Sequence, residues 1–397
     1  MPTHIDKLKV LIAGIFSLIL MLGVARFAYT PLLPLMQVQA GVSDSLGGWL
    51  ATFNYMGYMS GALIAATITD LNLKDKLYRI GLFVAVITTA GMAVTDNIFI
   101  WSLMRFFAGL SSAAGLLIGS GLILNWLMRN NFRSELGIHF SGVGLGIAFC
   151  AVVVEWMAGS YDWRELWWLF TLLGALLAIP AWCWLPRPKQ AGSSPADSKM
   201  QDNPPSKRFM YLMLAAYFCA GWGYVISATF IVTIVERLPS LEGYGSIMFL
   251  ILGLSAAPAC INWDLIARKT GVLTALLIAY LAQIIGIIIP ALSDSVWAVT
   301  FSAMLFGGTF IGIVSLVLTM AGRFYPTKPA KLMGKMTLTY GIAQIIAPAV
   351  TGNLAERFGN FDLGLWIAAA MVLFGAAIIG LIMILERNTY SEALTSH

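Results

Sequence analysis

The sequence predicts an all-α polytopic membrane protein with twelve transmembrane helices. Of its 397 residues, 59% are hydrophobic and only 11% are charged, whereas a soluble chain of this size has about 25% charged residues. The charges gather in short clusters. The uncharged stretches between them are about 19–25 residues long, close to the roughly 20 residues that an α-helix needs to span the hydrocarbon core. A transmembrane β-barrel would instead show alternating strands of about ten residues.

The predicted spans follow one another along the chain and are separated by charged loops. They cover residues 10–36, 46–69, 77–95, 98–128, 136–158 and 166–185 in the first half, and 209–235, 244–263, 271–291, 296–321, 336–354 and 362–385 in the second. The first span is too long for a cleavable signal peptide, contains Arg26 and has no small-residue cleavage site. The four cysteines lie within or at the ends of spans, so we expect them to be small packing residues.

The distribution of basic residues predicts that both termini are cytoplasmic. Of the 24 Lys and Arg residues, 19 flank the spans on the side of the termini. Arg164, Arg237 and Arg357 fall in the opposite loops, and Arg26 and Arg105 lie inside spans. This asymmetry follows the positive-inside rule. The net charge of +5 therefore reflects membrane topology, and nucleic acid is not an expected partner.

A polar segment divides the chain into two halves. Residues 187–208 are rich in Pro, Ser and charge, which is typical of a flexible linker. We predict an N-terminal six-helix bundle over residues 1–186, a cytoplasmic linker over 187–208 and a C-terminal six-helix bundle over 209–397. Similar residues recur at nearly constant spacing in both halves: Gly23 and Gly221, Asp70 and Asp264, Gly109 and Gly308, Gly137 and Gly334, Trp167 and Trp366. Parallel repeats of this kind are typical of one large transporter class.

Several motifs resemble those of the major facilitator superfamily. The loop AATITDLNLKDKLYR retains Asp70 and the basic residues of that superfamily's Gly-x-x-x-Asp-Arg-x-Gly-Arg-Arg motif, although Ala66 replaces the glycine. NWDLIARKTG is its second copy, and RFFAGLSSAAG matches the Arg-x-x-x-Gly pattern of span 4. DWRELW and QIIAPAVTG resemble the stretches before span 6 and within span 11. The resemblance covers the whole chain. It implies two bundles that rock around a central cavity lined by spans 1 and 4, with span 5 beside them.

Two stretches narrow this resemblance. The opening GVARFAYTPLLPLM is similar to the first span of the bacterial YbfB/YjiJ-type branch. Span 5, GIHFSGVGLGIAFC, lacks the Gly-Pro pair that is typical of proton-driven drug exporters. A drug antiporter is therefore the less favoured function, and the branch itself implies no substrate.

Two arginines inside predicted spans are the strongest candidates for a binding site. From the helical rise, Arg26 and Arg105 lie in the outer half of the N-terminal bundle, and Glu155 lies near the outer end of span 5. A charge at the middle of a bilayer costs on the order of 2.5–3.5 kcal/mol. Three interpretations are open: Glu155 pairs with one arginine, Arg26 snorkels to the interface, or an arginine faces the cavity and binds an anion. One carboxylate cannot neutralise two guanidinium groups, which favours the third.

Aromatic and amide residues in the spans can complete a pocket for a polar or amphipathic molecule. The predicted substrate-binding residues are Arg26, Tyr29, Asn54, Tyr58, Arg105, Asn125, Tyr224, Tyr340 and Gln344. The alternative for each is a packing role, with its hydrogen bonds satisfied inside the protein.

Charged residues at the predicted cytoplasmic ends of the spans suggest a conformational gate. Asp70 follows span 2, and Asp264 and Arg268 hold the matching place in the second half. Asp70 can pair with Arg129 or Arg133 of the next inner loop, or face the positive end of a neighbouring helix. We expect these contacts to form in one state and to break in the other. The alternative is a set of solvated charges that only fix topology.

Glu155 and His139 are the candidates for proton coupling, and a structural role is the alternative for His139. The sequence has no P-loop motif, no spaced metal ligands and no cluster of nucleophile, base and acid. We therefore expect no cofactor, no metal and no enzyme activity.

These observations predict a secondary active transporter that moves a small organic solute, anionic or amphipathic, across the bacterial inner membrane by alternating access. Its expected partners are the substrate, protons and the lipid bilayer, and we expect a monomer. Drug/proton antiport and uniport are the alternatives within the class. A membrane-embedded enzyme or a sensor is the alternative outside it.

Overall fold

The computed structural model is helical along nearly its whole length and describes residues 3–130, 132, 136–188, 202–325 and 330–395. The N-terminal half contains α1 (His4–Leu18), the π-helical η1 (Ile19–Phe27), α2 (Tyr29–Ala40), α3 (Asp44–Thr67), α4 (Leu71–Val94), α5 (Ile98–Ala113), the π-helical η2 (Ala114–Gly119), α6 (Ser120–Arg129), α7 (Leu136–Met157) and α8 (Trp163–Cys183). The C-terminal half contains α9 (Lys207–Glu236), α10 (Gly245–Ala256), α11 (Ala259–Thr270), α12 (Val272–Ile288), the 3₁₀ turn η4 (Ile289–Ala291), α13 (Val296–Phe324), α14 (Ala330–Phe358) and α15 (Asp362–Thr395). Each predicted span falls on one of these helices or on a run of consecutive ones.

The helices are long and apolar, as a bilayer requires. Within the described ranges, nine segments can cross a membrane, and a tenth is added if α10 and α11 form one span bent by 46°. Pro258 lies at that bend, where its missing N–H interrupts the helical hydrogen bonds. The less apolar helices α3 and α14 pack against each other, so much of their surface faces protein rather than lipid. The predicted all-α polytopic fold is confirmed, although apolarity alone identifies fewer spans than twelve.

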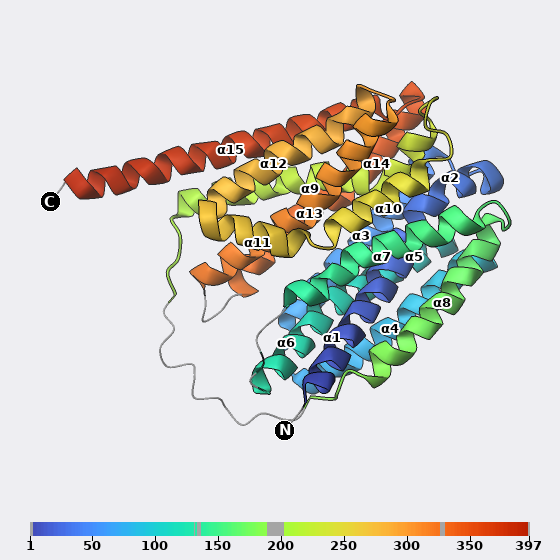
Figure 1. The fold of residues 1–397 in the computed structure, drawn as a ribbon, viewed down its shortest axis with the longest axis horizontal. Helices are drawn as coiled ribbons and strands as arrows, with labels where there is room; N and C mark the ends of the chain where they lie inside the picture. The colour runs from blue at the N-terminus through green and yellow to red at the C-terminus, as the bar shows by residue number, and fades with distance from the viewer. Residues whose placement is uncertain (1–2, 131, 133–135, 189–201, 326–329, 396–397) are drawn as a thin grey trace.

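The two halves lie side by side, meet at one end and separate toward the other (Figure 1). We call the first the sealed end; it holds residues 41–45, 237–244 and 353–361. We call the second the diverging end; it holds residues 64–72, 120–130 and 260–271. The main contacts between the halves run along two helix pairs, α3 with α14 and α7 with α10.

Glycines allow the backbones of these pairs to approach closely. A Cβ atom on Gly48 of α3 would lie 2.2 Å from the carbonyl oxygen of Pro348 in α14, and one on Gly144 of α7 would lie 2.3 Å from the amide nitrogen of Ala257. Small residues at helix crossings are how membrane helices pack without side chains between them. The two interfaces are therefore smooth, and they position the walls of the central cavity.

Candidate functional site

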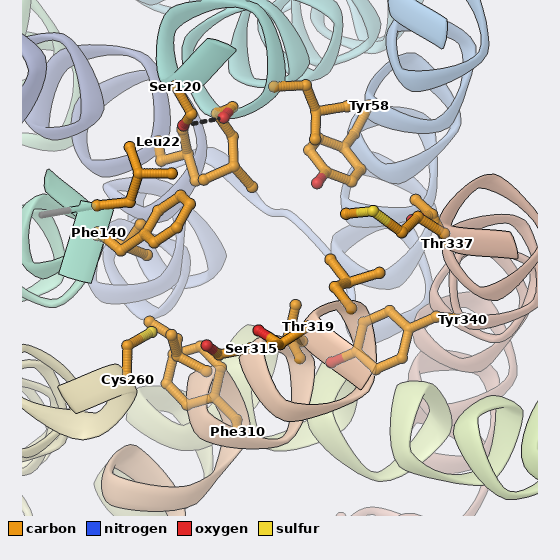
Figure 2. Close-up of a pocket in the computed structure, with 18 of the residues that line it drawn as sticks. Leu22, Tyr58, Ser120, Phe140, Cys260, Phe310, Ser315, Thr319, Thr337 and Tyr340 are labelled. Atoms are coloured by element: carbon orange, nitrogen blue, oxygen red, sulfur yellow. Dashed lines mark hydrogen bonds between the residues drawn. The ribbon is translucent and has the colours of Figure 1, made fainter. Parts of the chain in front are cut away.

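A cavity of about 490 Å³ lies between the two halves. The N-terminal half lines it from η1, α3, η2, α6 and α7, and the C-terminal half lines it from α9, α11, α13 and α14. Figure 2 shows Tyr58, Ser120 and Phe140 around the same open space as Phe310 and Tyr340. Most of the lining is aliphatic or aromatic. The described polar groups that line it are Arg26, Tyr58, Ser120, Tyr217, Tyr224, Ser315, Thr319, Thr337, Tyr340 and Gln344.

Arg26 is the charged group of this cavity. It lies in the π-helical segment η1, and its side chain is only 6% exposed. Its guanidinium carbon lies 4.5 Å from the ring centre of Tyr55, 4.7 Å from that of Tyr58 and 5.2 Å from that of Phe27. The Nε atom has no hydrogen-bond partner among the described residues, and no ion pair to Arg26 occurs there. Arg26 is thus a buried cation that packs on aromatic rings and has no counter-ion in the part of the chain that the structure describes.

Arg105 has a different environment from the one the sequence suggested. Its guanidinium donates to the carbonyl oxygens of Ala25 at 3.2 Å and Arg26 at 3.3 Å, and its Nε lies 3.5 Å from the carbonyl of Leu50. The carbonyls lie close to an irregularity in the helix. The chain changes from the π-helical to the α-helical register between η1 and α2, and Pro31 has no N–H to donate to the carbonyl of Phe27 four residues back or of Arg26 five residues back. Arg105 therefore completes the backbone hydrogen bonds under Arg26, and it is not among the residues that line the cavity.

Three more predicted substrate-binding residues are also absent from the described cavity lining. The Tyr29 hydroxyl donates to the carbonyl of Gly47 at 3.0 Å, and the guanidinium of Arg105 lies 4.4 Å from the Tyr29 ring centre. Asn54 is fully buried and donates to the carbonyl of Arg105 at 3.0 Å. Asn125 is half-buried on α6. Tyr29 and Asn54 support the helices around Arg26, whereas Tyr58, Tyr224, Tyr340 and Gln344 do line the cavity.

A stack of aromatic rings from the C-terminal half forms the other side of the cavity. We call Tyr217, Tyr224, Phe310 and Tyr340 the aromatic wall. Tyr217 and Tyr340 stack with ring centres 4.5 Å apart. Tyr224 stacks on Phe310 at 5.1 Å and on Tyr340 at 5.9 Å. The sequence analysis missed Tyr217 and Phe310, because nothing in the one-dimensional pattern distinguishes a cavity-lining ring from a core ring.

The two proton-coupling candidates occupy unlike places. His139 is completely buried behind the cavity wall, with its Nε2 2.9 Å from the Oγ of Ser120, which lines the cavity. Its Nδ1 has no partner among the described residues. Gly14 makes room for the ring, since a Cβ atom there would lie 2.5 Å from Nδ1. The side chain of Glu155 is exposed near the end of α7 and pairs with neither arginine in the described part of the chain.

Two of the predicted gating residues, Asp70 and Asp264, make local contacts within their own halves. Asp70 is the N-cap of α4, and its side chain accepts from the amide of Asn72 at 3.0 Å. Asp264 pairs with Arg268 at 2.6 Å within α11. Arg129 ends α6, and Arg133 lies outside the described residues. The pairing of Asp70 with these arginines stays a prediction.

Charged contacts between the halves occur at the sealed end instead. Both terminal nitrogens of Arg237, at the end of α9, donate to the carboxylate of Asp44 at the start of α3, at 2.6 and 2.9 Å. The Glu356 carboxylate of α14 accepts from the Ser43 hydroxyl and the Ser45 amide, each at 3.0 Å. A carboxylate at a helix N-terminus is favoured by the helix dipole. These pairs could not be predicted from the sequence, because their members are far apart along the chain.

This fold and cavity define a class of protein, the membrane transporters whose two helical halves enclose a binding site. The chain belongs to the family described as "Uncharacterised MFS-type transporter YbfB", whose model matches residues 18–380. The predicted membership of the major facilitator superfamily is thereby confirmed. The chain is a multi-pass membrane transporter with a small-molecule substrate.

Relatives agree with this assignment, and a solved structure shares the fold. "Probable sulfoacetate transporter SauU" of Cupriavidus necator is 23% identical over 408 residues, which cover 93% of each chain. "Uncharacterized transporter mfc1" of Schizosaccharomyces pombe is 26% identical over 176 residues, 44% of this chain and 35% of that protein, so the match spans about a third of its length. The crystal structure of the nucleoside transporter NupG superposes with a TM-score of 0.71 and 15% identity, covering 96% of this chain and 98% of that one.

Proposed function

We propose that the protein is a secondary active transporter for small organic anions and that Arg26 binds the anionic group. The observation that carries this proposal is Arg26 itself, a buried cation that lines the cavity and has no counter-ion among the described residues. The rings of Tyr55 and Tyr58 pack against the guanidinium. Its N–H groups lie in the guanidinium plane, so a carboxylate or sulfonate can accept two parallel hydrogen bonds from that edge.

The chemistry of the cavity lining favours an anion over a cationic drug. The described residues that line the cavity include one arginine and no aspartate or glutamate. A bound cation would lie near an unpaired positive charge in surroundings of low dielectric, which is unfavourable. The printed name of SauU, which gives sulfoacetate as its substrate, adds support from a relative for an anionic substrate.

Alternating access is supported by the arrangement of the two halves. Residues 43–45 contact the C-terminal half at the sealed end, and the cavity extends from Arg26 toward Leu124, Gly322 and Met333 nearer the diverging end. Opening the sealed end while the diverging end closes would expose the same cavity to the other side of the membrane. Charged contacts at one end and smooth helix pairs between the halves suit such a rocking motion.

We further propose that the protein lies in a bacterial inner membrane with both termini in the cytoplasm and that protons drive transport. The positive-inside distribution supports both termini and the diverging end on the cytoplasmic side of a bacterial inner membrane. We infer that protons drive transport by a monomer, and that His139 is the better candidate for the coupling site, because Ser120 connects it to the cavity. A cysteine at Asn203, in the linker, should then resist an impermeant thiol reagent that labels a cysteine at the exposed Val38 in intact cells.

Ligand binding by purified protein tests the function directly. We would measure thermal stabilisation of the full chain by sulfoacetate, hexanoate and 1-naphthoate, in the native protein and in Arg26→Lys. Binding of at least one anion should fall about 10–100-fold in Arg26→Lys, because lysine keeps the charge but loses the bidentate fork. Arg208→Lys, at an exposed position on α9, is the matched control. If no anion stabilises the protein, or if Arg26→Lys binds as well as the control, the anion site is wrong.

A further inference from the structure

We infer that the transported anion carries its charge on a planar aromatic ring system and has a single negative charge. This inference rests on the proposed function and specifies the substrate class of the same cavity. It comes from the wall opposite Arg26, from the number of charges in the lining and from the size of the cavity.

The aromatic wall offers stacking surfaces rather than an irregular apolar lining. Its rings are nearly parallel where they meet: the planes differ by 25° between Tyr224 and Phe310, by 27° between Tyr224 and Tyr340, and by 30° between Tyr217 and Tyr340. Aromatic pairs prefer such offset-stacked geometry and gain about 0.5–1.5 kcal/mol beyond the area they bury. A flat ring in the cavity can extend this array, whereas a saturated ring of the same size cannot stack.

Tyr340 of the aromatic wall and Tyr58 on the facing half each present a hydroxyl to the cavity. In Figure 2 the hydroxyls of Tyr58 and Tyr340 point into the cavity from opposite halves. A phenol hydroxyl can donate to an anionic oxygen. The cavity thus offers ring faces for an aromatic group and donors for its acidic group.

The charges in the lining match one negative charge. Arg26 is the cation among the described lining residues, and the further polar groups toward the diverging end are the neutral hydroxyls of Ser120, Ser315, Thr319 and Thr337. A second carboxylate there would be desolvated without a cation, which is costly. Hydroxyls instead suit an uncharged polar substituent, such as a phenol or an amide.

The volume of the cavity also favours an aromatic monoanion over a small dianion. Pockets of about 300–1,000 Å³ hold drug-sized molecules, and this cavity measures about 490 Å³. Sulfoacetate has two charges, few atoms and no ring, so it would occupy little of this space and leave the aromatic wall without a partner. The aromatic wall and the single cation thus point to a different anion from the one in the name of SauU.

Four naphthalene-type probes test the inference on the purified full chain. They are 1-naphthoate, its saturated analogue decahydronaphthalene-1-carboxylate, the dianion naphthalene-1,4-dicarboxylate and the neutral 1-naphthalenemethanol. We would measure their dissociation constants by isothermal titration calorimetry. We expect 1-naphthoate to bind about tenfold more tightly than each of the others. Tyr340→Leu should remove the preference over the saturated acid, and Tyr211→Leu, at a residue 65% exposed on α9, should keep it.

The outcomes distinguish this inference from the proposed function. If the two monocarboxylates bind equally and Arg26→Gln weakens both, the anion site stands and the aromatic class is overturned. If the dianion binds as well as 1-naphthoate, the single charge is overturned. If 1-naphthalenemethanol binds as tightly as 1-naphthoate, or if Arg26→Gln changes nothing, the proposed function fails as well. Phe310→Leu serves as a second wall variant if Tyr340→Leu does not fold.

Discussion

The hydroxyl of Thr30 donates a hydrogen bond of 2.9 Å to the carbonyl of Ala228, and these residues are separated by 198 positions. The same spacing relates Arg26 to Tyr224, and both of those side chains line the cavity. Residues at equivalent places of two repeats can touch only near the axis that relates the repeats. The contact between Thr30 and Ala228 is therefore the one expected if the predicted repeat has its axis beside the cavity. The two segments differ there in backbone, which is π-helical at Arg26 and α-helical at Tyr224, and in chemistry, with a guanidinium on one side and a phenol on the other.

Replacing the two intramembrane arginines should have opposite effects on stability. Arg105→Met removes the donors to the carbonyls of Ala25 and Arg26, so we expect a loss of about 2–4 kcal/mol and a lower midpoint of thermal unfolding in detergent. Arg26→Met removes a buried charge that has no counter-ion among the described residues, so we expect an unchanged or higher midpoint together with loss of anion binding. A larger destabilisation by Arg26→Met than by Arg105→Met would show that these roles are reversed.

Breaking the charged contact at the sealed end should open that end. Asp44→Asn weakens the bidentate pair with Arg237, and about 1 kcal/mol is enough to shift a two-state population roughly fivefold. Pulsed electron–electron double resonance between spin labels at positions 38 and 242, in place of Val38 and Glu242, should then show a population at longer distance. The charge-swapped variant, Asp44→Arg with Arg237→Asp, should restore the short distance.

The matched control is an ion pair of the same length within one half. Asp96 and Arg164 are 2.6 Å apart and both belong to the N-terminal half. Asp96→Asn should therefore leave the distance between the labels unchanged. An equal shift in both variants would mean that the effect comes from a general loss of surface charge.

Two substitutions of Asp70 should separate its capping role from its charge. Asn is as good an N-cap as Asp, whereas Ala costs typically about 1 kcal/mol. We expect Asp70→Ala, but not Asp70→Asn, to lower the unfolding midpoint, because the side chain caps α4. If the predicted gate exists, both variants should slow uptake into proteoliposomes. Normal uptake by Asp70→Asn would mean that Asp70 caps α4 and has no role in gating.

Removing His139 should uncouple transport from the proton gradient. Gly14, Ser120 and Phe140 lie next to the His139 ring, and Ser120 also lines the cavity, so the imidazole is within one hydrogen bond of the proposed substrate site. We expect His139→Gln to abolish the acceleration of uptake by an imposed pH gradient while leaving equilibrium exchange intact. Glu155→Gln, at an exposed residue, should retain the acceleration. The reverse result would transfer the coupling role to Glu155.

The sequence predicted the fold well because span length, polar linkers and repeats are local or periodic properties. It also predicted that Arg26 is unusual, since a charge inside an apolar helix is visible without tertiary structure. It could not distinguish Arg26 from Arg105. That difference depends on Pro31 and the change of helical register, which bring backbone carbonyls within reach of Arg105. The contacts of Asp44 with Arg237 depend on how the two halves pack, so the helical pattern of the sequence cannot predict them.

The division of the cavity between the halves has a consequence for inhibition. The guanidinium belongs to the N-terminal half and the ring stack belongs to the C-terminal half. On the proposed binding mode, a single small molecule therefore ties together two bodies that must move apart for release. A compound that binds both surfaces too tightly would dissociate slowly and so lower the rate of transport. The aromatic acids that bind most tightly should thus act as inhibitors, and the acids of intermediate affinity should be transported fastest.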